Sequence, residues 1–105
     1  MKKFELVRDA LGDLQDIWEY ISEESFDVAD RVLEDLLDAF GQLAESPDIG
    51  HKREHLTTRE LLFWPVRSYL TIYRSSNPLR VVRVVHGKAM AKHFSRSAGA
   101  LSDLF

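Results

Sequence analysis

Apolar residues recur at steps of three and four positions in two consecutive stretches of the first half of the chain. This spacing is typical of amphipathic helices, which bury one stripe of side chains. We predict one helix over residues 10–23, capped by Asp9, and a second that begins after Ser25 and stops before Pro47. A short turn separates them, so they should form an antiparallel hairpin. The two stripes are Leu11, Leu14, Ile17, Trp18 and Ile21, then Ala29, Val32, Leu33, Leu36, Phe40 and Leu43.

Strand patterns account for most of the other apolar positions. Residues 4–6 alternate briefly, and three apolar segments of the second half are bounded by turn-forming residues. Residues 46–58 carry proline, glycine and charges without a period, so we predict a loop there. Residues after Gly87 favour a helix through about Phe94, within a tail at 89–105. The predicted strands of the second half are Leu61–Trp64, Tyr69–Arg74 and Arg80–His86, with turns at 65–68 and 75–78.

The resulting order of elements is β-α-α-β-β-β, with a C-terminal helical tail. A helical hairpin cannot cover the strands if its two stripes bury only each other. We therefore predict an α+β fold in which the hairpin packs on one face of a mainly antiparallel sheet. At 105 residues the chain forms a single domain over 1–105.

Composition excludes several classes of protein. The chain has no cysteine, which rules out disulfides, thiolate metal sites and a cysteine nucleophile. No apolar run approaches the roughly 20 residues of a membrane span, and the N-terminal residues lack the apolar segment of a secretory signal. His51, His55 and His93 do not recur at metal-ligand spacing. We expect a cytoplasmic protein without contact with a membrane, without a metal and without another cofactor.

Charge is divided between the two halves of the chain. Residues 1–50 carry four basic and fourteen acidic groups, whereas residues 51–105 carry ten basic and three acidic groups. Side chains alternate across a strand, and we expect Leu70 and Ile72 to face the helices. Tyr69 and Arg83 would then share a face that is open to a partner, and interfaces are enriched in these two residue types. Alternatively, the strand arginines pair with the acidic helices of the same chain.

Five segments, in order and with matching spacing over roughly residues 4–88, resemble the ParE-type toxins of the RelE/ParE superfamily. They read DLQDIWEYISEES, VADRVLEDL, LAESPDIG, REHLTTRELLFWPVRSYLTIYR and LRVVRVVHG. After the last of them the family commonly continues with arginine and aspartate, whereas this chain has Lys88-Ala89-Met90.

The resemblance implies a toxin of a type II toxin–antitoxin system that inhibits DNA gyrase by protein–protein binding. A cognate antitoxin would neutralise it and would supply the DNA-binding part of their complex, so that the toxin meets DNA only indirectly. A homodimer or a toxin–antitoxin heterotetramer is compatible with this reading.

Two alternatives remain open. The RelE branch of the superfamily cleaves messenger RNA on the ribosome, which needs a general base, a general acid and cations. His86 is the best candidate for such chemistry, but no tyrosine follows Tyr73, so the acid–base pair is incomplete and we expect no enzyme activity. The other alternative is a non-toxic relative that still binds antitoxin. The predicted target or antitoxin interface comprises Arg67, Tyr69, Arg83, His86 and Lys88, with a contribution from the 89–105 tail.

Overall fold

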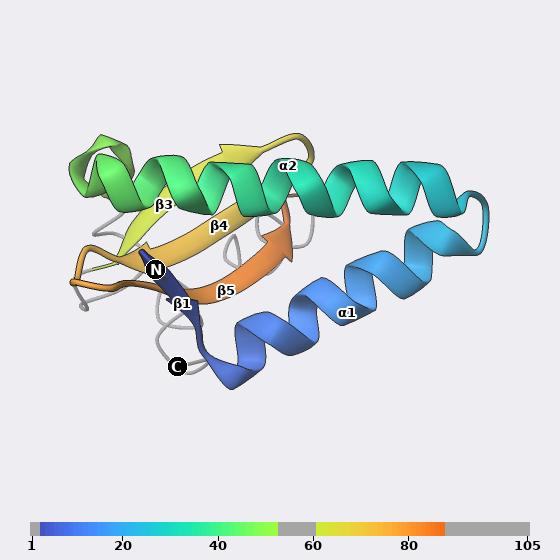
Figure 1. Ribbon diagram of the computed structural model, residues 1–105, viewed down its shortest axis with the longest axis horizontal. Coiled ribbons are helices and arrows are strands. Elements are labelled where there is room, and N and C mark those ends of the chain that lie inside the picture. Colours follow the sequence, from blue (N-terminus) through green and yellow to red (C-terminus); the bar gives the residue numbers. More distant parts are fainter. Residues whose placement is uncertain (1–2, 53–60, 88–105) are drawn as a thin grey trace, which may run out of the picture.

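The computed structural model describes residues 3–52 and 61–87 (Figure 1). The predicted α+β fold and its order of elements are confirmed, and the structure adds a short strand in the predicted 46–58 loop. The predicted helix after Gly87 lies outside the described residues. The elements are β1 (Phe4–Leu6), α1 (Arg8–Ser22), α2 (Phe26–Glu45), a 3-10 turn (Pro47–Ile49), β2 (His51–Lys52), β3 (Leu62–Val66), β4 (Tyr69–Arg74) and β5 (Leu79–His86).

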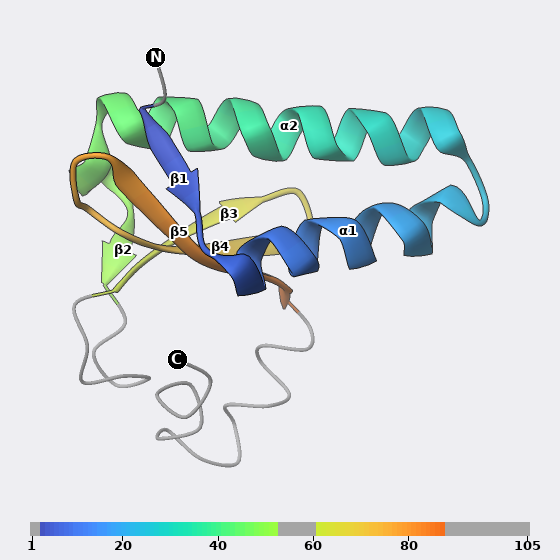
Figure 2. The same ribbon diagram turned by 60° about the horizontal axis from the view of Figure 1, so that its bottom comes forward.

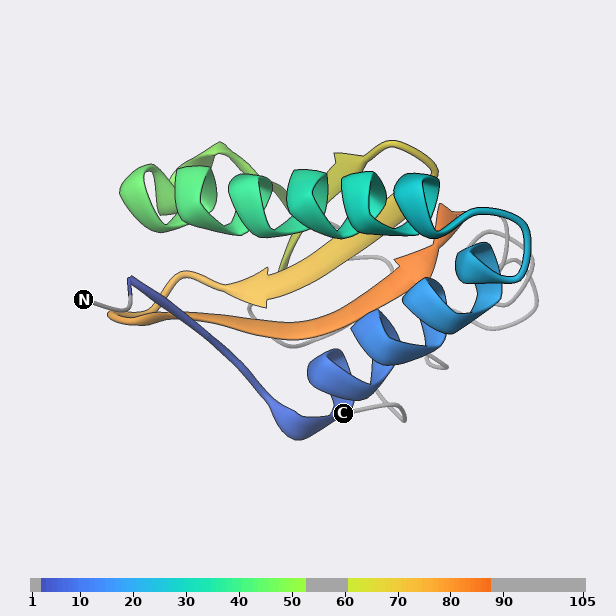
Figure 3. The same ribbon diagram turned by 45° about the vertical axis from the view of Figure 1, so that its right-hand side comes forward.

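The strands form one sheet in the order β1-β5-β4-β3-β2. β1 runs parallel to β5, and the other neighbouring strands are antiparallel. Both helices lie on the same side of this sheet (Figure 2). The turn between α1 and α2 reaches beyond the ends of the strands (Figure 3), so that the far part of the hairpin has no sheet beneath it.

The helices bury most, but not all, of the predicted stripes. On α2 the stripe is buried as expected apart from the half-buried Leu33, and the hydroxyl of Ser25 caps the helix by accepting the N–H of Val28 at 3.2 Å. On α1 the buried residues are Ala10, Leu14 and Ile17, whereas Leu11 is half exposed. The predicted cap at Asp9 is wrong, because α1 begins at Arg8 after an extended Val7.

Our prediction of which face of β4 meets the helices is also wrong. Tyr69 and Tyr73 pack with the helix-side core, whereas Leu70 and Ile72 lie with Phe63 on the opposite face. Both faces of β4 are largely buried, so hydrophobicity alone could not choose between them. On the helix side the hydroxyl of Tyr73 donates to the carbonyl of Pro47 at 2.7 Å, a hydrogen bond that leucine or isoleucine could not form.

β3 continues further than the predicted Leu61–Trp64. Pro65 pairs with Leu70 of β4 inside the strand, and the turn consists of two residues only. β2 pairs only with Leu62 and Phe63, so β3 is an edge strand where Pro65 lies. An edge position tolerates a proline because no neighbouring strand needs its missing N–H.

Candidate functional site

The turn between β3 and β4 carries one of the predicted interface residues in an uncommon conformation. Arg67 and Ser68 form the turn, since Val66 pairs with Tyr69 across it. Arg67 has a φ of 55°, in the left-handed region that disfavours side chains larger than glycine. Its Nε donates to Oδ2 of Asp35 on α2 at 2.6 Å, and both side chains are about half exposed. The guanidinium is therefore directed toward α2.

The end of β5 lies beside the same turn. His86 pairs with Tyr69, and their rings meet edge to face with 5.4 Å between centroids. The N–H of Gly87 donates to the carbonyl of Ser68 at 2.8 Å, and a Cβ at position 87 would lie 3.3 Å from that oxygen. The structure thus brings together Arg67, Tyr69 and His86, which we call the sheet-end cluster.

Tyr69 belongs to the cluster but is less accessible than expected. It packs against the helix-side core, and burial raises the pKa of its phenol, with a smaller contribution from Tyr20 of α1. At neutral pH the phenol therefore stays protonated, and it can donate a hydrogen bond but is a poor general base.

Arg83 is held apart from this cluster by α1. Its Nε donates to Oδ2 of Asp13 at 2.7 Å and its Nη2 donates to Oδ1 at 3.0 Å. The hydrogen bonds to the carboxylate of Asp13 raise the pKa of Arg83, although burial opposes the shift. The expected open face shared by Arg83 and the tyrosines is therefore not formed.

The alternative, in which these arginines pair with the acidic helices of the same chain, holds for Arg67 and Arg83, whereas the partner of Arg80 lies on a strand. Besides Arg67 and Arg83, Arg80 binds Glu5 of the neighbouring β1, with Nη2 and Oε1 2.7 Å apart. The opposite charges of the two halves were the sequence signal for these pairs, but they could not identify Asp13 and Asp35 as the partners.

Several expectations concern other parts of the chain. Lys88 and the 89–105 tail lie outside the described residues. Within residues 3–52 and 61–87, no three histidine or carboxylate side chains gather in a way that could hold a metal ion. No helix in the same ranges is long and apolar enough to cross a membrane.

The structure also places the two tryptophans. Trp64 packs against the helix-side core from β3. Trp18, which we expected in the core, is only partly buried. Its Nε1 donates to Oδ1 of Asp30 at 2.9 Å near the far end of the hairpin. The turn predicted at 65–68 is shorter than expected, because only Arg67 and Ser68 lie between the paired residues of β3 and β4.

Comparisons with known proteins agree with this architecture. The chain is similar to a solved structure described as the chromosomal ParDE TA system from P. aeruginosa, with 15% identity and a TM-score of 0.66. That match covers 79% of this chain and 92% of the other, and at this identity it shows the fold alone. No curated protein matches the sequence. The model of the ParE toxin family, described as the ParE toxin of the type II toxin–antitoxin system parDE, matches residues 4–90. The chain therefore belongs to the ParE toxin family.

Proposed function

We propose that the protein is a toxin that acts in the cytoplasm, inhibits DNA gyrase by binding it, and is neutralised by a cognate antitoxin. The observation that carries the proposal is the family match over residues 4–90, which spans every described strand and helix. A toxin of a two-component system requires an antitoxin partner, and inhibition by binding requires a contact surface rather than a catalytic centre.

The sheet-end cluster is the surface that we propose for the contact with gyrase or antitoxin. Arg67 is partly exposed at a turn, and its ion pair with Asp35 lowers the entropy that a partner must remove when it binds. His86 and Tyr69 flank it, and arginine and tyrosine are frequent among residues that dominate binding energy. Arg83 contributes through its pair with Asp13 of α1, and Lys88 lies two positions after His86 in the sequence.

Purified gyrase provides the test of the target. The full-length chain should block supercoiling of relaxed plasmid and increase the amount of linear, cleaved DNA, and addition of the co-purified antitoxin should reverse both effects. A chain that arrests growth but leaves gyrase fully active would refute gyrase as the target while leaving the toxin assignment intact.

Cleavage of messenger RNA on the ribosome is the second candidate, and one observation favours it. Tyr69 and His86 lie side by side, as an acid and a base for RNA cleavage would. Against it, the pKa of Tyr69 is raised, and Arg67 and Arg83 are already paired with carboxylates. Those cations are poorly available for the extra charge of a phosphorane.

Ribosomes translating a defined messenger separate the two candidates. The binding toxin leaves the messenger intact when it is added to such ribosomes. Appearance of cleaved messenger that depends on the chain, and that is lost in His86→Ala, would establish the enzyme instead.

A further inference from the structure

The far end of the helical hairpin carries an aromatic stack on its surface. The rings of Trp18 on α1 and Phe26 on α2 are stacked, with centroids 5.7 Å apart and planes 24° from parallel. The bond from Trp18 Nε1 to Asp30 fixes the orientation of the indole. Phe26 is nevertheless 67% exposed, and nearby in sequence Tyr20 is 75% exposed. We call Trp18, Phe26 and Asp30 the hairpin platform.

The stack joins the two helices and is also exposed to solvent. The hairpin reaches beyond the strands at this end, so the sheet cannot cover the platform (Figure 3). Phe26 stacks on Trp18 and is nevertheless a largely exposed residue. Exposed aromatic side chains that are held in a fixed geometry are typical anchors of protein interfaces.

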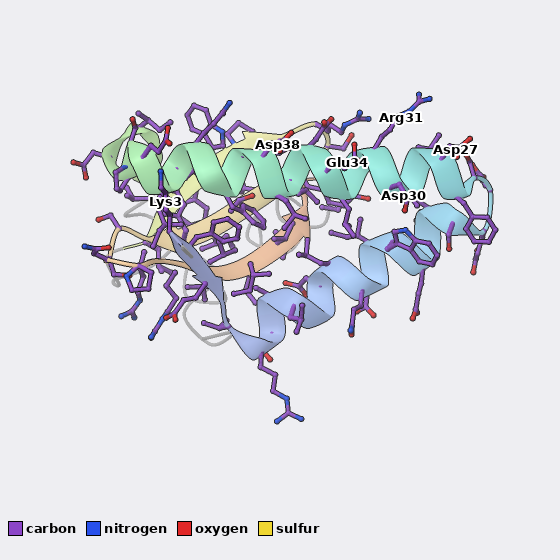
Figure 4. All side chains as sticks on the ribbon, in the orientation of Figure 1. Lys3, Asp27, Asp30, Arg31, Glu34 and Asp38 are labelled. Atoms are coloured by element: carbon purple, nitrogen blue, oxygen red, sulfur yellow. The ribbon has the colours of Figure 1, made fainter. Side chains whose placement is uncertain are left out.

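Carboxylates outnumber cations near the platform, where Arg31 of α2 (Figure 4) is the one basic residue among residues 18–31. Asp27 and Asp30 lie at the hairpin end of α2 (Figure 4), and Glu19 and Glu23 are neighbours in sequence on the α1 side. Among the ion pairs of the described residues, none neutralises Glu19, Glu23 or Asp27. The surface therefore combines a negative potential with exposed aromatic rings.

We propose that the hairpin platform binds an arginine-bearing segment of a partner protein. Both properties of the surface select the same group: a guanidinium stacks on an aromatic face and also forms bidentate hydrogen bonds with a carboxylate. The negative potential disfavours nucleic acid and acidic peptides. The platform is made by residues of the two helices, whereas the sheet-end cluster is made by residues of the β3–β4 turn and of β4 and β5.

The test uses the full-length chain, isotope-labelled for NMR, and two short peptides. One peptide has arginines spaced by alanines, and the other has glutamate at the arginine positions. The reporter is the indole N–H signal of Trp18, which Trp18→Phe distinguishes from that of Trp64. We expect the arginine peptide to shift this signal in a saturable manner and the glutamate peptide to leave it unchanged.

Variants test whether the aromatic ring of Phe26 contributes to binding of the arginine peptide. Phe26→Leu keeps an apolar side chain but removes the aromatic face, and because the residue is exposed the fold should tolerate it. We expect binding to weaken about fivefold, as for the loss of one exposed cation–π contact. Leu37→Ala removes a half-exposed side chain elsewhere on α2 and should change nothing.

Three results would each overturn the proposal. The first is equal binding of the arginine peptide by wild type and Phe26→Leu. The second is equal shifts of the Trp18 signal with the two peptides. The third is a shift that depends on the concentration of the chain alone, which would assign the platform to a second copy. The assay contains no gyrase, so its outcome is independent of the proposed target.

Discussion

The carboxylate of Asp13 on α1 binds both the guanidinium of Arg83 and the backbone of β5. Besides the two hydrogen bonds from Arg83, Oδ2 accepts the N–H of Val84 at 2.9 Å. β1 pairs with β5 only as far as Val81, so the edge of β5 is open beyond that residue. One helix side chain therefore takes the place of the missing strand and neutralises the adjacent arginine.

Replacement of Asp13 by asparagine should destabilise the fold by about 2 kcal/mol, since the two side chains are only 13% and 22% exposed and Arg83 would lose a charged partner. The change in free energy of unfolding can be measured by urea titration. Glu5→Gln is the matched control, because its pair with Arg80 is about half exposed and exposed pairs contribute less than about 1 kcal/mol. Equal losses in the two variants would contradict the role given to Asp13.

Removal of the hydroxyl of Thr71 should stabilise the folded protein. The residue is fully buried in β4, and among the described residues its Oγ1 has no hydrogen-bond partner. Valine has nearly the same shape without the unpaired polar group, so Thr71→Val should raise the free energy of unfolding by about 1 kcal/mol. Thr71→Ser, which keeps the hydroxyl and loses a methyl group, should lower it. A destabilised Thr71→Val would indicate that the hydroxyl has a partner.

The position of Tyr73 predicts a loss of stability at alkaline pH. Burial raises the pKa of its phenol above the ordinary value of 10.0. Below pH 10 the phenol is protonated in both states, so its contribution to stability is complete. Above pH 10 the unfolded chain binds fewer protons than the folded chain, and the free energy of unfolding falls as pH rises.

Urea titrations between pH 8 and 11 measure this decline. Tyr73→Phe should be less stable at pH 8, because the links to Pro47 and Gly50 are lost, but its decline above pH 10 should be shallower than that of wild type. Tyr69→Phe should reduce the remaining slope further, since burial raises the pKa of that phenol too. Parallel curves for wild type and both variants would contradict the prediction.

Gly50 should tolerate no side chain. Its N–H donates to the hydroxyl of Tyr73 at 2.9 Å, and a Cβ at this position would overlap that hydroxyl and lie 2.8 Å from ring atoms of the same residue. Tyr73 is fully buried and cannot move aside easily, so Gly50→Ala should cost about 2 kcal/mol or more. Gly41→Ala in α2 meets nothing within 4 Å and should stabilise the helix by about 0.5–1 kcal/mol. A lower unfolding temperature for Gly50→Ala and a higher one for Gly41→Ala, each relative to wild type, would confirm this difference.

The sequence predicted the elements better than their orientation. The spacing of apolar residues in α1 and α2 is unambiguous because each helix has one polar face, so the hairpin could be predicted. β4 has two buried faces, and neither Tyr69 nor Leu70 carries a signal that says which one meets the helices. A register shift between Ile72 and Tyr73 adds to the difficulty, since it changes the face on which residues of β5 lie.

The candidate site was foreseen only in part. Adjacent antiparallel strands bring their ends together, so the proximity of Arg67, Tyr69 and His86 follows from the hairpin once the turn is placed. The carboxylates that hold the arginines lie more than 30 residues away along the chain. Only packing of the helices on the sheet decides that Asp13 and Asp35 face them.

Replacement of Arg67 separates function from stability at the proposed contact surface. Glycine adopts a φ of 55° freely, so Arg67→Gly should relieve a backbone cost of about 1 kcal/mol and lose an exposed ion pair of similar or smaller value. The free energy of unfolding should therefore stay within about 1 kcal/mol of wild type. If the guanidinium contacts the target, the variant should nevertheless lose most of its ability to arrest growth. Asp35→Asn, which removes the partner and leaves the cation available, should keep that ability. Full growth arrest by a stably folded Arg67→Gly would remove Arg67 from the contact surface.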